Sequence, residues 1–139
     1  MPSFVRLDDV VVVIAEDDDD VRFALSEFLI QKGATVFACP DARAALEAVR
    51  ARRPDIVLSD IGLPKRDGFE LLQDIRSLDP EQGGSVPVIA VTALEGIVDQ
   101  TGTADSGFRA ILHKPFKPDR LLSTVVSTLD PDRISTTET

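Results

Sequence analysis

Acidic side chains, a threonine and a lysine follow four apolar runs of this chain, at the points where those runs end. The five consecutive acids Glu16–Asp20 follow the β-branched run Val10–Ala15, and Asp60 closes a later apolar run. Thr92 and Lys114 close two more. Carboxylates can bind a cation or attack an electrophile, while a lysine and a hydroxyl can stabilise negative oxygen atoms. These residue types therefore suit phosphoryl transfer to an aspartate, provided that the fold brings them together.

Asp60 is the candidate nucleophile of this group, because it ends an apolar run and opens into a loop with turn-forming residues. Glu16, Asp17 and Asp60 cannot all stay ionised at close range without a counter-charge. Mg²⁺ suits oxygen ligands where phosphate is also bound. We expect Asp60 to be nucleophile and metal ligand at once. We expect Lys114 to neutralise the phosphoryl oxygens with the metal, and the Thr92 hydroxyl to donate to one of them.

The elements that must position these residues follow from hydrophobic periodicity. Apolar runs predict five strands at 10–15, 34–39, 55–60, 86–91 and 109–113. Helices are expected between them and after the last, at about 19–32, 41–52, 69–78, 94–107 and 118–129. The helix at 94–107 rests on its place in the alternation, since its glycines and threonines lower helix propensity. Five β-α units predict an α/β fold with a parallel sheet, helices on both faces, and all strand carboxyl ends at one edge.

Length and composition limit the organisation and the class of protein. The 139 residues fit one domain, with residues 1–9 as a lead-in, 10–129 as the domain and 130–139 as a polar, frayed tail. A net charge of −9 argues against direct nucleic-acid binding, because phosphates would be repelled. The single Cys39 cannot form an internal disulfide, which suits a reducing cytoplasm, and no apolar stretch is long enough to span a membrane.

Four sequence motifs together resemble those of one family. They are Val12-Val-Ile-Ala-Glu16-Asp17-Asp18, Asp55-Ile-Val-Leu-Ser-Asp60-Ile-Gly-Leu-Pro-Lys-Arg-Asp-Gly68, Val91-Thr92-Ala93 and Lys114-Pro115-Phe116. The set resembles the response-regulator receiver domains of two-component signalling, over about residues 9–130. The resemblance implies a doubly wound, flavodoxin-like (βα)5 sheet with strand order 2-1-3-4-5.

The resemblance also implies a role for each matching residue. Asp60 corresponds to the phosphoacceptor and Asp17 to a direct Mg²⁺ ligand, while Glu16 binds the metal directly or through water. The backbone carbonyl of Gly62 is implied as a further ligand. Thr92 corresponds to the switch hydroxyl and Lys114 to the phosphate-contacting lysine, whose bond to Pro115 resembles the family's cis peptide. Asp18 is interpreted as a helix cap or surface acid instead of a ligand.

One position departs from the family pattern. Three residues before the lysine the family often has tyrosine or phenylalanine, and this chain has Ile111. An isoleucine cannot make the same swing with a polar tip, so we expect the signal to pass through another element, with the weak helix at 94–107 as the candidate. Phe108 is a poor substitute because it lies three residues too early. His113 is interpreted as a strand residue pointing away from the site.

The sequence predicts a stand-alone receiver, not an enzyme beyond its own phosphorylation and dephosphorylation. It would accept a phosphoryl group from a sensor histidine kinase or a histidine phosphotransfer protein and act on a downstream protein. One alternative is a phosphatase or phosphotransferase with an aspartyl-phosphate intermediate, although Gly62 stands where such enzymes place a second acid. The other is a constitutive pseudo-receiver, against which the intact acids, Thr92 and Lys114 argue.

Overall fold

The computed structural model describes residues 5–93, 107–129 and 135–136, and its centre is a five-stranded parallel sheet. The strands are β2 (Val11–Ala15), β3 (Thr35–Cys39), β4 (Ile56–Asp60), β5 (Val88–Thr92) and β6 (Ala110–His113). Their spatial order is β3-β2-β4-β5-β6. Numbered along the chain among themselves, these strands have the order 2-1-3-4-5, so the predicted flavodoxin-like sheet is confirmed.

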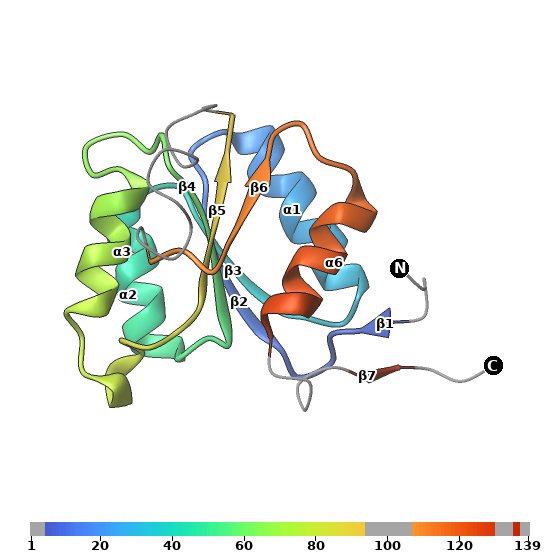
Figure 1. Cartoon of the computed structure of the whole chain (residues 1–139), viewed down its shortest axis with the longest axis horizontal. Coiled ribbons are helices and arrows are strands. Elements are labelled where there is room, and N and C mark those ends of the chain that lie inside the picture. The colour runs from blue at the N-terminus through green and yellow to red at the C-terminus, as the bar shows by residue number, and fades with distance from the viewer. Residues whose placement is uncertain (1–4, 94–106, 130–134, 137–139) are drawn as a thin grey trace.

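Helices cover both faces of this sheet (Figure 1). Helices α1 (Asp19–Gln31) and α6 (Pro118–Thr128) pack on one face, and α2 (Ala42–Arg52) and α3 (Gly68–Arg76) pack on the other. A 3₁₀ turn, η1 (Pro80–Gln82), follows α3. The helix predicted at 94–107 falls, apart from Gly107, outside the described residues. No helix of the described residues is both long enough and apolar enough to cross a membrane.

The unbroken apolar run of β2 is explained by burial on both faces. Val12 and Ile14 belong to the core beneath α1 and α6, whereas Val13 and Ala15 belong to the core beneath α2 and α3. Because successive strand residues point to opposite faces, a central parallel strand needs an apolar residue at every position. Polar residues are therefore excluded from the strand itself and follow it, at its carboxyl end.

Aspartates begin three of the helices as N-caps. Asp18 accepts hydrogen bonds from the amides of Asp20 and Val21. Asp41 caps α2, as predicted, and Asp67 forms a capping box with Glu70 at the start of α3. Each cap satisfies amides that have no partner within the helix.

Element boundaries differ slightly from those predicted. Strand β5 begins at Val88, two residues later than expected, and Pro87 just before it has no N–H to give to a ladder. Helix α3 runs from Gly68 to Arg76 instead of 69–78. These shifts leave the strand carboxyl ends, and therefore the site, where the sequence placed them.

Two segments from opposite ends of the described residues pair in a small sheet that the sequence did not predict. Strand β1 (Val5–Arg6) pairs antiparallel with β7 (Ser135–Thr136). Val5 and Leu7 are buried in the core beneath α1 and α6, and the Leu7 amide donates to the Lys32 carbonyl at 2.7 Å. The predicted fraying of the tail is therefore wrong at Ser135 and Thr136, and the lead-in contributes to the core because two of its apolar side chains alternate toward it.

Candidate functional site

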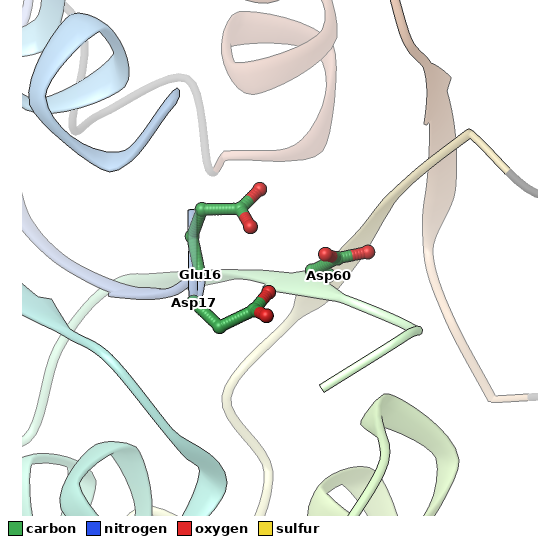
Figure 2. A group of neighbouring side chains, drawn as sticks. All are labelled: Glu16, Asp17 and Asp60. Atoms are coloured by element: carbon green, nitrogen blue, oxygen red, sulfur yellow. The ribbon is translucent and has the colours of Figure 1, made fainter. Parts of the chain in front are cut away.

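Three carboxylates meet at the carboxyl edge of the sheet. Glu16 and Asp17 directly follow β2, and Asp60 ends the neighbouring strand β4. One ligand oxygen from each lies within 4.8 Å of the others, and Figure 2 shows the three side chains side by side. Glu16 is 1% exposed, whereas Asp17 is exposed. The buried Glu16 and the exposed Asp17, both next to Asp60, complete an oxygen-rich group suited to a hard divalent cation.

Lys114 brings positive charge to this group from β6's end. Its Nζ donates to Oε1 of Glu16 at 2.5 Å and to Oδ2 of Asp60 at 3.4 Å. The backbone amide of Lys114 donates to the Thr92 carbonyl at 2.9 Å, and the bond to Pro115 is cis, as the family resemblance implied. The lysine therefore bridges acids from two different strands.

The pKa values of Glu16 and Lys114 reflect this arrangement. Burial raises the pKa of Glu16, although the hydrogen bond from Lys114 acts the other way. For Lys114, burial favours the neutral amine, but the hydrogen bond to Glu16 and the charge of Asp60 outweigh it and raise its pKa. The ionised form of Glu16 is therefore costly here, and a further cation would stabilise it.

The acidic pair after β2 is held by hydrogen bonds from its surroundings. The guanidinium of Arg22 donates to the Glu16 carbonyl at 2.9 Å, and the Asp18 amide donates to Glu16 Oε2 at 3.1 Å. Asp18 caps α1 and is not part of the carboxylate group, which confirms its interpretation as a cap. Arg22 was missed by sequence reasoning, and its position near the start of the helix that follows the acids is the signal that could have found it.

The loop after Asp60 requires glycine at one position and has room for a side chain at another. A Cβ atom at Gly68 would lie 2.5 Å from the Asp60 carbonyl oxygen and 2.7 Å from Cα of Ile61. At Gly62 a Cβ atom would meet nothing within 4 Å. The Gly62 amide donates to Asp60 Oδ1 at 3.2 Å. Gly68 thus lets the start of α3 approach the strand end that carries Asp60.

The remaining predicted residues lie on β5 and β6. Thr92 is fully buried at the end of β5, one residue beyond Val91, which is in register with Asp60. Ile111 is partly buried against the core beneath α2 and α3. The exposed His113 stands outside the carboxylate group, as its interpretation requires.

An apolar groove of about 510 Å³ adjoins Lys114. Its walls come from α1 and from the segment that leads into α6, including Phe28, Phe116 and Leu121. Two further apolar side chains of α1 face solvent, Phe23 at 67% exposure and Ile30 at 50%. Exposed apolar surface of this kind is typical of protein interaction sites.

Comparison with known proteins agrees with this geometry. A family model described as the response regulator receiver domain matches residues 12–126. The chain belongs to this family. Receiver domains are the phosphorylation-activated switches of two-component systems, and the family is one of signalling switches instead of true enzymes. An acidic Mg²⁺ pocket is typical of the family, and Glu16, Asp17 and Asp60 form an acidic group that fits it.

Relatives of this receiver domain differ in length. An uncharacterised 14.6 kDa protein of Leptolyngbya boryana is 35% identical over 114 residues, which are 82% of this chain and 86% of that protein. The response regulator MprA of Mycolicibacterium vanbaalenii is 31% identical over 112 residues, 81% of this chain but 47% of the relative. The chain therefore spans about half the length of several response regulators that it matches.

Solved receiver structures share the fold. The chemotaxis protein CheY4 of Vibrio cholerae has 28% sequence identity and a TM-score of 0.78, covering 86% of this chain and 98% of that one. The receiver domain of the sensor histidine kinase PA1611 of Pseudomonas aeruginosa has 28% identity and a TM-score of 0.76, covering 86% and 96%. That receiver was solved with a magnesium ion coordinated in its active-site cleft.

Proposed function

We propose that this receiver domain is a phosphorelay switch in which Asp60 accepts a phosphoryl group from a phosphohistidine donor. The observation that carries the proposal is the environment of Asp60, with Glu16 and Asp17 on the neighbouring strand end and Lys114 Nζ 3.4 Å from its Oδ2. A carboxylate attacks phosphate poorly unless positive charge surrounds it. The carboxylates can bind a cation, and Lys114 supplies a second positive charge.

In the proposed reaction an Oδ atom of Asp60 forms a bond to phosphorus as the N–P bond of the donor's phosphohistidine breaks. Glu16, Asp17, Asp60 and the Gly62 carbonyl would hold Mg²⁺, which supplies positive charge to the transferring group. Lys114 would neutralise a phosphoryl oxygen, and the Thr92 hydroxyl would donate a hydrogen bond to another. The same residues keep the product acyl phosphate in place until water hydrolyses it.

The proposed partner is a sensor histidine kinase or a histidine phosphotransfer protein, with output through contact with a downstream protein in the cytoplasm. A phosphodonor must bring its histidine to Asp60 and therefore covers the surface next to Lys114. The groove that adjoins Lys114 offers apolar surface for that contact.

A small-molecule phosphodonor tests the proposal without the natural partner. The protein is incubated with acetyl phosphate, with and without Mg²⁺, and intact mass is followed. We expect Mg²⁺-dependent addition of one phosphoryl group, and none in Asp60→Asn. Repeated turnover of an aryl phosphate would instead favour the enzyme alternative, and no modification under either condition would favour the constitutive module.

A further inference from the structure

The edge of the sheet opposite the carboxylates carries a basic hollow of about 540 Å³. It opens where α3 ends and where β5 and β6 begin, and its lining includes Arg76, Pro80, Gly84, Ser85, Phe108 and Arg109. Its volume lies within the range of small-molecule sites, roughly 300–1,000 Å³. The hollow lies at the opposite edge of the sheet from Asp60, so its ligand has to be inferred from its own residues.

The charge of this hollow is opposite to that of the chain. None of the described residues that line it is acidic, although the chain has 24 acids and 15 bases. Burial and the nearby charge of Arg109 lower the pKa of Arg76. Within the described part of the chain no carboxylate forms an ion pair with either arginine. Two cations thus face the same space, and an anion between them would relieve their repulsion.

The donors of the hollow are positioned by its backbone. The Arg76 guanidinium donates to the Gly84 carbonyl at 2.9 Å, which fixes its direction and leaves its other N–H groups for a ligand. A Cβ atom at Gly84 would lie 2.0 Å from the Leu78 carbonyl oxygen, so this wall depends on glycine. Neither Ser85 nor the Arg109 side chain has a hydrogen-bond partner in the described part of the chain, and both are exposed.

We propose that the hollow between Arg76 and Arg109 is a second ligand site of this protein, which binds the phosphate group of a small molecule. The planar fork of a guanidinium matches two oxygens of a phosphate at once, and two such forks can hold one phosphate from different sides. The amide and hydroxyl of Ser85 add uncharged donors next to them. The remaining volume accommodates the organic part of the ligand, against the apolar Leu78 and Pro80.

The test is titration of ¹⁵N-labelled protein, without Mg²⁺, with inorganic phosphate and separately with glycerol 3-phosphate. Wild type is compared with Arg109→Ala and with Arg43→Ala, an exposed arginine of α2 outside the hollow. We expect saturable shifts of the Ser85 and Arg109 amides, and an affinity at least about tenfold weaker in Arg109→Ala only, because charge-assisted hydrogen bonds are lost. Tighter binding of glycerol 3-phosphate identifies a phosphorylated small molecule, and equal binding identifies free phosphate.

Three results would overturn the proposal. They are the absence of saturable shifts, an equal loss of affinity in both arginine variants, and shifts confined to the surroundings of Lys114. The last would show that phosphate binds only beside Asp60. An Asp60→Asn background keeps this distinction clear, since it alters the carboxylate site and leaves the basic hollow intact.

Discussion

Lys114 Nζ lies 3.4 Å from Oδ2 of Asp60, although 54 residues separate them in the sequence. The contact exists because β4 and β6 end at the same edge of the sheet, with β5 between them. It gives the proposed nucleophile a fixed positive neighbour before any phosphodonor arrives. It also ties the last strand of the sheet to its third.

Replacement of Lys114 by alanine should therefore slow phosphorylation of Asp60. Loss of one charge-stabilising donor commonly costs on the order of 10²-fold in rate, and we expect a loss of that order with acetyl phosphate and saturating Mg²⁺, followed by intact mass. Lys117→Ala is the control, because that lysine is exposed and does not contact the carboxylates. Equal rates for the two variants would contradict the assigned role of Lys114.

Asp17 should be needed for Mg²⁺ binding but not for folding, because its side chain is exposed. For wild type we expect the thermal midpoint to rise with Mg²⁺, with a stabilisation of about 2–3 kcal/mol once Mg²⁺ exceeds its Kd about a hundredfold. Asp17→Asn should lose this rise and keep its midpoint in metal-free buffer. Asp20→Asn, another exposed acid of the same run, should respond as wild type does. A full Mg²⁺ response in Asp17→Asn would argue against the proposed ligand set.

Alanine substitutions at Gly68 and Gly62 can be compared to test how tightly the loop after Asp60 is packed. In Gly68→Ala the new methyl group would overlap the backbone of Asp60 and Ile61, and overpacking of this kind costs about 1–3 kcal/mol. In Gly62→Ala the methyl group meets open space, and stability should stay within about 0.5 kcal/mol. Chemical denaturation measures both. The reverse order of stabilities would show that the approach of α3 to Asp60 is not tight.

Cys39 should react slowly with thiol reagents in the folded protein. It is 8% exposed, and burial, followed by the charge of Asp41, raises the pKa of its thiol above the ordinary value of 9.0. Near pH 8 we expect alkylation slower than in denatured protein by on the order of 10³-fold or more, because only opened molecules react. Labelling followed by mass spectrometry measures this. Rapid labelling of native protein would contradict the burial.

The raised pKa of Cys39 also sets a direction for stability against pH. A thiol that binds its proton more tightly in the folded state contributes stability that is complete below pH 9.0. That contribution is lost as pH rises through the folded-state value. Cys39→Ala should therefore lose less stability than wild type over that alkaline range, measured as the difference in unfolding free energy at two pH values.

The order of the strands was implied by the family resemblance, whereas the apolar runs of the sequence predicted the parallel sheet and the edge at which the acids, Thr92 and Lys114 lie. This was possible because unbroken apolar runs mark buried parallel strands, and right-handed crossovers then fix where the strands end. The N-caps at Asp18 and Asp41 were equally readable, since their partners are local.

Features that depend on contacts distant in sequence could not be read in this way. The pairing of β1 with β7 joins two short segments that lack strand periodicity. The convergence of Arg76 and Arg109 depends on how the end of α3 lies relative to the start of β6. In each case the sequence contains the residues, but only the packed fold decides that they meet.

Locating the phosphoryl group tests directly whether Asp60 is the phosphoacceptor. The protein is treated with acetyl phosphate and Mg²⁺, the acyl phosphate is trapped by borohydride reduction, and the peptides are sequenced by mass spectrometry. We expect reduction at Asp60 alone, and none without Mg²⁺. A modified residue elsewhere, for example at Asp17 or Asp67, with Asp60 unchanged would contradict this assignment.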